Sequence, residues 1–355
     1  MLKFALVGCG RIAKRHSELL GHNQIKDASL VAVCDIDIDK AKKIGSQFSV
    51  PYYADMDEMM RKESIDVVSV LTESGYHAKH VIQLAQYGKH IVVEKPMALT
   101  LDDADDMIKA CDAHHCKLFV VKQNRFNVPV VKLKEAMDQK RFGKLVLGTI
   151  RVRWSRDQSY YDQAWWRGRW DMDGGVLTNQ ASHHVDLLEY MMGDVESVFA
   201  KSATALVDIE AEDTGIVILK FKNGALGLIE ATTAVRPKDL EGSISILGEK
   251  GTVEIGGFAV NQMLHWNFVE PQEGDDDVME TYSVNPPNVY GFGHQAYYEH
   301  VVDSIKHNKP QMVAGLEGRK SLALISAIYE SIETGQEVFL KYKPKQCKLG
   351  ILNES

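Results

Sequence analysis

The stretch that decides the fold is KFALVGCGRIA, residues 3–13. Its apolar start predicts a buried strand, and the pattern that follows the glycines predicts a helix to about Leu20. A glycine-rich turn between a strand and a helix is typical of dinucleotide sites. Gly8 allows the tight turn, and Gly10 lets main-chain N–H groups approach a pyrophosphate. Ala13 stands at the third glycine position and is small enough for close helix–strand packing.

The next apolar run, residues 30–34, stops at Asp35. An acidic side chain at this strand end can accept both ribose hydroxyls of a dinucleotide, and it repels a 2′-phosphate. The residues that follow, Ile36 and Asp37, provide no cation for such a phosphate. The sequence therefore predicts NAD as the cofactor rather than NADP. The alternative is a doubly wound domain that binds no nucleotide.

Short apolar runs then alternate with helical patterns along the first third of the chain. Strands are expected over about 66–71, 90–94 and 117–121, and helices over about 38–48, 77–87 and 101–114. Such alternation predicts a Rossmann-type α/β fold, a doubly wound parallel sheet with right-handed crossovers. We expect this NAD-binding domain to cover residues 1–123.

The pattern changes at about residue 126, where a helix over about 128–139 leads into closely spaced strands. These strands are expected near 147–154, 195–206, 214–221, 225–234, 243–247, 251–255 and 259–268. Strands separated by turn signals such as Asn223-Gly224 predict an open, largely antiparallel sheet, one face of which helices cover. Helices over about 182–191, 295–306 and 317–334 are available for this. We expect an α+β domain over residues 124–345 and a tail over 346–355.

Composition narrows the class of protein. The 355 residues are 45% hydrophobic and 25% charged, with a net charge of −8, which fits a folded chain and disfavours general binding to nucleic acid or anionic membrane. No apolar run is long enough for a membrane span, and we expect no signal peptide. The five cysteines include no CxxC pair and favour a reducing cytoplasm. The group Cys111, His114, His115 and Cys116 matches no zinc spacing, so we expect no metal.

Further motifs carry a resemblance to a known family. They are Thr72-Glu-Ser-Gly-Tyr-His77, Glu94-Lys95-Pro96, and Gly174-Gly175 followed by His183-x-x-Asp186. Together with the glycine turn and Asp35, they resemble the Gfo/Idh/MocA family of NAD(P)-dependent sugar oxidoreductases. The shorter motifs at 121–125, 166–168, 179–183, 240–251 and 290–294 are similar to a bacterial branch of that family. Members of that branch oxidise UDP-N-acetyl-2-amino-2-deoxyglucuronate at C3 in the synthesis of surface polysaccharide, including O-antigen.

Two positions depart from the common family pattern. Glu73 stands where members often have proline, which bears on how the 72–77 loop meets the nicotinamide ribose. Asn179 stands where many members have aspartate, as it also does in the C3-dehydrogenase branch. Because asparagine carries no charge, it cannot hold an imidazolium as an aspartate would.

The resemblance implies two catalytic residues, Lys95 and His183. Oxidising a secondary alcohol removes a hydride from carbon and a proton from the hydroxyl, so a base and a group that stabilises the alkoxide lower the barrier. We assign His183 as the proton acceptor and Lys95 as the alkoxide donor, with the reverse assignment as the alternative. His184 is expected to be structural, and Asp186 to orient a neighbour.

The resemblance also implies cofactor and substrate contacts. Cofactor contacts are expected from Gly8, Gly10, Arg11, Ile12, Asp35, Thr72, Ser74, His77, Glu94, Lys95, Gln123, Trp166 and Arg167. Substrate contacts are expected from Lys95, Lys122, Asn124, Arg125, Arg169, Asn179, Gln180, His183, Arg236 and Tyr290. Cations suit a uronate carboxylate and a diphosphate, and side-chain amides suit an acetamido group. Trp166-Arg167 can be assigned to either the cofactor or the substrate. For Tyr160, Tyr161 and Trp165 the alternative to a site role is packing in the core or contact between subunits.

Three functions follow as hypotheses. The first is an NAD-dependent C3 dehydrogenase of the nucleotide sugar, and the second is an NAD-dependent dehydrogenase of a free cyclic polyol or monosaccharide. The third is a non-catalytic NAD-binding redox sensor, which the joint presence of Lys95 and His183 argues against. The family resemblance further implies self-association through the C-terminal sheet into dimers or tetramers.

Overall fold

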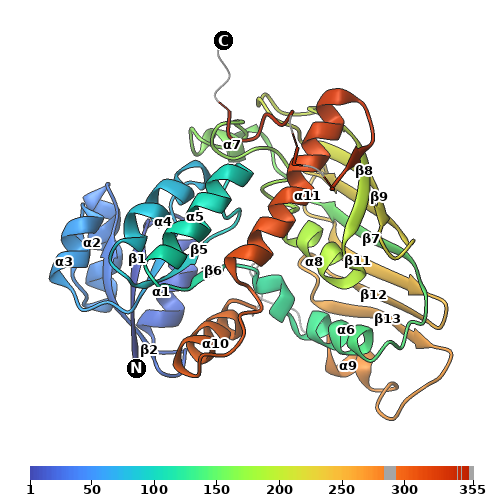
Figure 1. Cartoon of the computed structure of the whole chain (residues 1–355), viewed down its shortest axis with the longest axis horizontal. Helices are drawn as coiled ribbons and strands as arrows, with labels where there is room; N and C mark the ends of the chain where they lie inside the picture. Colours follow the sequence, from blue (N-terminus) through green and yellow to red (C-terminus); the bar gives the residue numbers. More distant parts are fainter. Residues whose placement is uncertain (284–292, 342, 345, 352–355) are drawn as a thin grey trace. The chain divides into compact units, whose positions relative to one another are not determined.

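The computed structural model describes residues 1–283, 293–341, 343–344 and 346–351. The chain forms two compact units, shown in Figure 1. The first contains Met1–Val121 and His294–Leu322, and the second contains Lys122–Gly293 and Ala323–Ser355.

The first unit is built on a six-stranded sheet in the order β3-β2-β1-β4-β5-β6. All its strand pairs are parallel, which confirms the predicted doubly wound fold. The strands are β1 (Leu2–Val7), β2 (Ala28–Cys34), β3 (Tyr52–Tyr53), β4 (Val67–Val70), β5 (His90–Val93) and β6 (Leu118–Val120). The connecting helices are α1 (Ala13–Gly21), α2 (Ile38–Phe48), α3 (Met56–Lys62), α4 (His77–Ala85) and α5 (Leu101–Ala113).

Local capping sets where several of these helices begin. The side chain of Asp37 accepts the N–H of Asp39 at the start of α2, and Thr100 Oγ1 accepts the N–H of Asp103 at the start of α5. Such caps satisfy main-chain donors that a helix start leaves open. The short pieces β3 and α3 were not predicted, because two strand residues and two helical turns give too little periodic signal.

The first unit also recruits residues 294–322, which the sequence-based boundaries placed in the second domain. Tyr298 of α10 (Gly293–Lys306) packs edge-on against Phe4 of β1, with ring centroids 5.6 Å apart. The N–H of Val120 donates to the carbonyl of Val313 at 2.8 Å. This late segment therefore extends the core of the N-terminal sheet, a long-range pairing that periodicity does not reveal.

The second unit is built on an eight-stranded sheet in the order β13-β12-β11-β7-β10-β9-β8-β14. Its strands are β7 (Leu145–Arg153), β8 (Val195–Ala203), β9 (Thr214–Phe221), β10 (Leu226–Thr232), β11 (Glu241–Gly248), β12 (Gly251–Gly256), β13 (Gln262–Phe268) and β14 (Val338–Phe339). The β7–β10 pair is parallel, and the other pairs are antiparallel. The predicted open, largely antiparallel sheet is confirmed.

Helices cover one face of this sheet (Figure 1). The helices of the unit are α6 (Val128–Asp138), α7 (Gln158–Asp162), α8 (Ser182–Met192), α9 (Val278–Thr281) and the second part of α11 (Gly315–Thr334). Gly148 of β7 makes room for α8, because a Cβ there would lie within 2.9 Å of Leu188 and Met192. On the opposite face Ile216 and Ile218 are exposed, while Val217 and Leu219 between and beside them are buried. The strand alternation thus separates a core face from an open apolar face.

The residues after β14 also belong to the second unit, although the sequence suggested a separate tail. Leu349 is buried, and the N–H of Gly350 donates to the carbonyl of Trp170 at 2.8 Å. Among the described helices, none combines the length and the hydropathy of a membrane span.

Candidate functional site

The glycine turn lies between β1 and α1, as predicted. Gly8 has φ +97°, and a Cβ on it would lie 2.7 Å from the carbonyl atoms of Leu71, so only glycine fits. A Cβ on Gly10 would meet nothing within 4 Å. That side of the turn is open, and Arg11 is exposed and Ile12 half-buried beside it. The helix α1 that follows begins without a side-chain cap, leaving its first N–H groups available to an anion.

Asp35 directly follows β2 and is fixed against this turn. Its Oδ2 accepts the N–H of Cys9 at 2.7 Å, and its Oδ1 accepts the N–H of Asp37 at 2.8 Å. The carboxylate is half-buried and held in one orientation. Open glycine backbone, a free helix start and an oriented carboxylate are the donors and acceptors that a dinucleotide needs. These residues fit NAD.

The loop after β4 carries Thr72, Ser74 and His77. Its 3₁₀ turn, η1 (Ser74–Tyr76), is preceded by Glu73 with φ −61°, a value that proline also adopts. Glu73 can therefore replace proline at this position without changing the course of the backbone. His77 Nδ1 lies 2.7 Å from the Pro96 carbonyl oxygen, and Nε2 lies 2.9 Å from that of Thr72. Burial lowers the pKa of His77, and its ring joins the 72–77 loop to the turn after β5.

Glu94 and Lys95 follow β5 at the carboxyl end of the sheet. Glu94 is buried and its Oε2 accepts the N–H of Lys95 at 3.0 Å. Lys95 is half-buried, and the peptide bond between Lys95 and Pro96 is cis. The carboxyl ends of parallel strands are where open α/β sheets meet their ligands, so Lys95 stands where the sequence placed it.

The second unit brings together His183 and Gln123. His183 lies in the first turn of α8, and its Nε2 is 2.9 Å from Gln123 Nε2 of the 3₁₀ turn η2 (Gln123–Phe126). Gln123 is buried, whereas His183 is half-buried. The amide N–H donates to the ring nitrogen, which requires His183 to carry its proton on Nδ1. The sequence assigned Gln123 to the cofactor and gave no sign of this contact.

Three buried charges tie η2 to α8. Asp186 accepts hydrogen bonds from Arg125 through Nε and Nη2, both at 2.8 Å, and Lys122 Nζ lies 3.1 Å from its Oδ1. The Arg125 guanidinium also lies 4.3 Å from the ring centre of Tyr190. Burial lowers the pKa of Lys122, and Asp186 opposes that shift. Lys122 and Arg125 were expected to meet the substrate, yet their charges have a carboxylate partner inside the protein.

The turn before α8 holds the expected amide side chains. Asn179 Nδ2 donates to Asp173 Oδ1, and Asp173 Oδ2 accepts the N–H of Gly168 at 3.1 Å. Asn179 is half-buried, while Asn124 and Gln180 are buried. Asp173 thus supplies a carboxylate next to position 179, where the common family pattern has an aspartate and this chain has Asn179.

His184 differs from its neighbour His183. Both of its ring nitrogens are buried and without a described hydrogen bond, and burial lowers its pKa to about 4. Its ring packs edge-on against Trp154, with centroids 5.8 Å apart. The neutral imidazole serves as core packing.

A buried residue that the sequence did not single out, Glu212, explains Gly175, and a positive φ explains Gly174. Gly174 has φ +76°, and a Cβ on Gly175 would lie 2.2 Å from the Glu212 carbonyl oxygen. Glu212 Oε1 accepts the N–H of Leu177 and the hydroxyl of Tyr329, both at 3.0 Å. Burial raises the pKa of Glu212 to about 7. This contact anchors the loop that leads to α8.

The remaining candidates lie at the surface of the second unit. Arg169 pairs with Asp171 at 3.0 Å, and Arg236 is exposed and donates to the carbonyls of Thr233 and Val235. Arg167 donates to the Tyr160 carbonyl and lies over its ring. The neighbouring Trp166 is half-buried, Trp165 is exposed, and Tyr161 is buried. Tyr290 lies outside the described residues.

Comparison with family models identifies the protein class. Residues 2–122 match the model of the oxidoreductase family's NAD-binding Rossmann fold, and residues 134–340 match that of its C-terminal alpha/beta domain. The chain belongs to the Gfo/Idh/MocA oxidoreductase family. It is an oxidoreductase whose N-terminal domain binds NAD.

Three relatives within this family are informative. The WlbA dehydrogenase of Bordetella pertussis, solved with NADH and UDP-GlcNAcA, is 42% identical, with a TM-score of 0.87 over 95% of this chain and 98% of that one. The WlbA dehydrogenase of Chromobacterium violaceum, solved with the same ligands, is 43% identical, with a TM-score of 0.88 over 95% of both chains. Myo-inositol 2-dehydrogenase of Thermotoga maritima is 30% identical over 96% of this chain and 99% of its own.

Proposed function

We propose that this Gfo/Idh/MocA dehydrogenase oxidises the C3 hydroxyl of UDP-N-acetyl-2-amino-2-deoxyglucuronate to the 3-keto sugar. The observation that carries the proposal is the identity of 42–43% with two dehydrogenases crystallised with this nucleotide sugar. The polyol dehydrogenase from Thermotoga maritima is more distant, at 30%. The product would serve bacterial surface polysaccharide synthesis in the cytoplasm.

NAD, when bound, supplies the acceptor for the hydride that leaves C3. Gly8, Gly10 and the start of α1 would hold its pyrophosphate, and Asp35 would accept the hydroxyls of its adenosine ribose. Thr72, Ser74 and Glu94 border the carboxyl end of the sheet and remain candidates for the nicotinamide half, as do Trp166 and Arg167.

The chain's own residues would handle the hydroxyl proton. We assign His183 Nε2 as the proton acceptor: the Gln123 amide donates to its lone pair in the free protein, and the substrate hydroxyl would take the place of that donor. The Lys95 ammonium would donate a hydrogen bond to the same substrate oxygen and stabilise its developing negative charge. One proton goes to the imidazole, one hydride leaves the carbon, and the C–O single bond becomes a carbonyl. The alternative is that Lys95 takes the proton and His183 donates.

Substrate recognition requires cations for the carboxylate and the diphosphate. Arg236, which is exposed, and Arg169, which is half-buried and paired with Asp171, are the candidates. Lys122 and Arg125 both pair with the buried Asp186, and the buried Glu189 also acts on Lys122, so these two cations are the weaker candidates. Asn124, Asn179 and Gln180 are the candidates for the acetamido group, because amides pair with amides.

A direct assay tests this proposal. The purified protein with NAD⁺ should form NADH with UDP-N-acetyl-2-amino-2-deoxyglucuronate, and much less with UDP-GlcNAc, which lacks the carboxylate. Lys95→Met and His183→Asn should each lower kcat by about 10²- to 10⁴-fold, as expected for loss of an acid–base group. Binding of NADH, followed by its fluorescence, should be unchanged in His183→Asn, because His183 is not among the expected cofactor contacts.

The second candidate is a free cyclic polyol or monosaccharide, favoured by the full-length similarity to myo-inositol 2-dehydrogenase. Turnover of myo-inositol or glucose without turnover of the nucleotide sugar would replace the first proposal with this one. Absence of turnover with every substrate, together with tight NADH binding, is what the sensor hypothesis requires.

We also propose that the open face of the second sheet pairs with another copy of the chain. Ile216 and Ile218 are 53% and 54% exposed, and Phe199, Leu226 and Leu228 lie exposed on the same three strands. An apolar patch of this kind on a sheet face is typical of a protein interface. Ile218→Lys should reduce the molar mass measured by light scattering, whereas Lys43→Glu, a change at an exposed position of α2 in the first unit, should not.

A further inference from the structure

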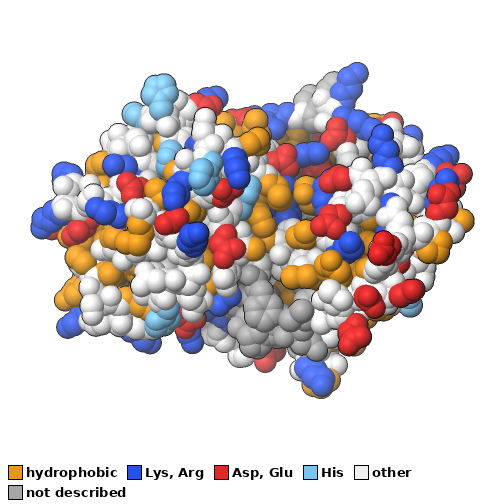
Figure 2. Space-filling model, turned by 90° about the horizontal axis from the view of Figure 1, so that it is seen from below, with side chains coloured by type: hydrophobic (Ala, Val, Ile, Leu, Met, Phe, Trp, Pro, Cys, Tyr) orange, Lys and Arg blue, Asp and Glu red, His pale blue; other side chains and the backbone are white. Residues whose placement is uncertain are grey.

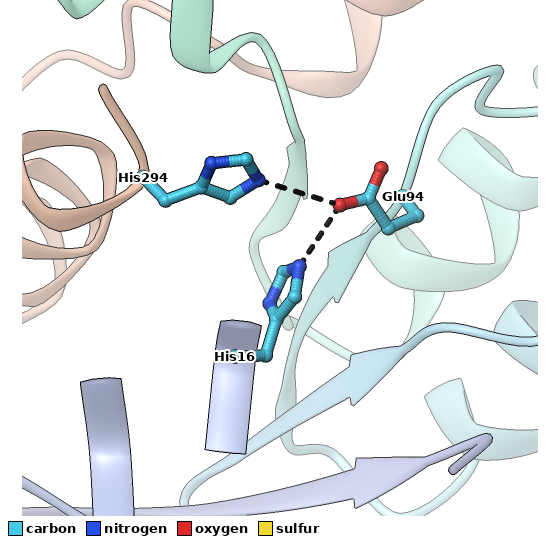
Figure 3. A group of neighbouring side chains, drawn as sticks. All are labelled: His16, Glu94 and His294. Atoms are coloured by element: carbon cyan, nitrogen blue, oxygen red, sulfur yellow. Dashed lines mark hydrogen bonds and ion pairs between the residues drawn. The ribbon is translucent and has the colours of Figure 1, made fainter. Parts of the chain in front are cut away.

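Three buried side chains from distant parts of the chain meet in the first unit (Figure 3). They are His16 of α1, Glu94 after β5, and His294 of α10. His16 Nε2 lies 2.9 Å from Glu94 Oε1, and His294 Nε2 lies 3.8 Å from the same oxygen. Neither the dinucleotide turn nor the Glu-Lys-Pro motif explains these two contacts, so the cluster requires its own explanation.

A continuous line of hydrogen bonds runs through this cluster. Ser69 Oγ lies 3.0 Å from Tyr298 Oη, and Tyr298 Oη lies 2.5 Å from His16 Nδ1. His16 then reaches Glu94 Oε1, and Glu94 Oε2 accepts the main-chain N–H of Lys95 at 3.0 Å. All of these side chains except that of Lys95 are buried.

Burial gives this line a direction. It lowers the pKa of His16, so the ring is neutral and carries one proton. Because Glu94 has no proton to give when ionised, His16 Nε2–H must be the donor to Oε1. Nδ1 is then an acceptor for the Tyr298 hydroxyl, and Tyr298 in turn accepts from Ser69. Every donor in the line points toward Glu94.

We propose that His16 and Tyr298 are positioning residues that hold Glu94 so that its second oxygen fixes the main chain of Lys95. The proposal rests on the role assigned above to Lys95. A carboxylate with two oxygens, one anchored by an imidazole and one bonded to the next N–H, leaves the Glu94–Lys95 peptide little freedom. An ammonium that must meet one substrate oxygen benefits from such a fixed starting point.

The same three residues also form a set of ligand types that zinc uses. The distances favour the hydrogen-bonded reading. Two ligands on one zinc ion each lie about 2.0–2.2 Å from the metal, and a separation of 2.9 Å between His16 and Glu94 is instead the length of an N–H···O bond. A metal is therefore an outcome that the experiment must be able to reveal.

The central test compares Glu94→Gln with Glu94→Ala. The amide keeps an oxygen for the Lys95 N–H, and its NH2 group can donate to His16 Nε2 once the ring carries its proton on Nδ1 and donates to Tyr298, whereas alanine keeps neither bond. We expect kcat to stay within about fivefold of the wild-type value for Glu94→Gln and to fall about 100-fold for Glu94→Ala. The KM for the nucleotide sugar should be nearly unchanged in both variants. Tyr298→Phe should lower kcat by about 2- to 10-fold, the effect of one lost hydrogen bond.

Tyr87→Phe is the matched control, because it removes a hydroxyl that bonds to Asp57 at 2.8 Å in the same unit. It should leave kcat unchanged. Equal loss of kcat in Glu94→Gln and Glu94→Ala would overturn the proposal, since the negative charge rather than the bonding pattern would then matter. Wild-type kcat in both Tyr298→Phe and Glu94→Ala would also overturn it.

A second readout does not depend on the substrate. Competitive acetylation by acetic anhydride, followed by peptide mass spectrometry, reports the reactivity of Lys95 relative to the exposed Lys14. The ratio should change in Glu94→Ala and stay the same in Glu94→Gln and Tyr87→Phe. If the nucleotide sugar is not turned over, the proposed function fails while this ratio still tests the positioning role. One equivalent of zinc found in the purified protein, and lost in His294→Ala, would replace the proposal with a metal site.

Discussion

Two buried carboxylates stand beside the two candidate catalytic residues, and the protein holds them in different ways. Glu94 of the first unit is bonded by an imidazole and by the N–H of Lys95. Asp186 of the second unit, one helical turn after His183, is bonded by the cations Arg125 and Lys122. The first arrangement fixes a main chain, and the second fixes a side-chain network around η2 and α8.

The difference has an energetic side. A buried charge is costly unless a partner compensates it, and a permanent cation compensates more strongly than a neutral imidazole. Glu212 is the limiting case: its Oε1 accepts from the neutral donors of Leu177 and Tyr329, no cation among the described residues pairs with it, and burial raises its pKa to about 7. The partner thus decides whether a buried carboxyl in this series keeps its charge. Burial opposes the charge of Glu94, yet hydrogen bonds from His16 and His294 hold its pKa well below the usual range, whereas burial prevails at Glu212.

Removing the carboxylate of the charged cluster should have the largest effect. Asp186→Leu leaves Arg125 and Lys122 buried without their partner, which we expect to lower the free energy of unfolding by about 3–5 kcal/mol. Denaturant titration of the variant and the wild type measures this difference. The exposed Lys109 pairs with Asp106 at the surface, and Lys109→Ala should show no measurable change. Similar stability of the two variants would mean that Asp186 is dispensable.

Glu212 provides a pH test of the neutral end of the series. Its pKa rises from 4.5 in the unfolded chain to about 7 in the folded one, so the folded state binds more protons between these values. Stability should therefore be greatest below pH 4.5 for this group and fall by roughly 3 kcal/mol as pH rises to 7. Glu212→Gln cannot titrate. The difference between its unfolding free energy and that of the wild type should change over this range, and a constant difference would contradict the assignment.

Arg125→Lys sharpens the comparison without removing a charge. The guanidinium binds both Asp186 oxygens, whereas an ammonium binds as a single point. We expect a loss of about 1–2 kcal/mol in unfolding free energy, attributable to the second hydrogen bond to a charged group. The control is Arg141→Lys, which disrupts a similar bidentate pair with Asp275 away from α8. It should lower the free energy of unfolding by a similar amount and leave kcat unchanged.

The smallest expected effect concerns the hydrogen bond between Gln123 of η2 and His183 of α8. Gln123→Leu removes the amide bonded to His183 Nε2 while keeping the volume similar. We expect kcat to fall by about 2- to 10-fold, corresponding to one hydrogen bond, with stability unchanged. Steady-state kinetics over a range of pH would show a shifted acid limb. An unshifted profile would indicate that Gln123 does not control the proton of His183.

The sequence predicted what local pattern encodes. The helix α2 begins and ends at the expected residues, since its apolar spacing lies within it and its capping residues, Asp37 and Ser49, flank it directly. The glycine turn and Asp35 were likewise predicted, because a strand, a turn and a helix follow one another along the chain. The parallel sheet followed from alternation alone.

The missing parts are contacts between residues far apart in sequence. His16 and Tyr298 are separated by 282 positions, and Arg125 and Asp186 by 61. A contact between two side chains so far apart in sequence produces no periodic pattern that could predict it. The same holds for the parallel pairing of β7 with β10. Arg125 shows the consequence. Its residue type suggested contact with an anionic group of the substrate, whereas in the fold it binds the carboxylate of Asp186.

The attachment of Asp35 has a consequence for engineering coenzyme preference. Both carboxylate oxygens already serve main-chain N–H groups, from Cys9 and Asp37. Exchanging the acid for a cation to accept a phosphorylated ribose would strip both amides of their acceptor and loosen the glycine turn itself. A successful redesign must therefore rebuild the 35–37 segment as a unit, supplying new acceptors along with the new positive charge.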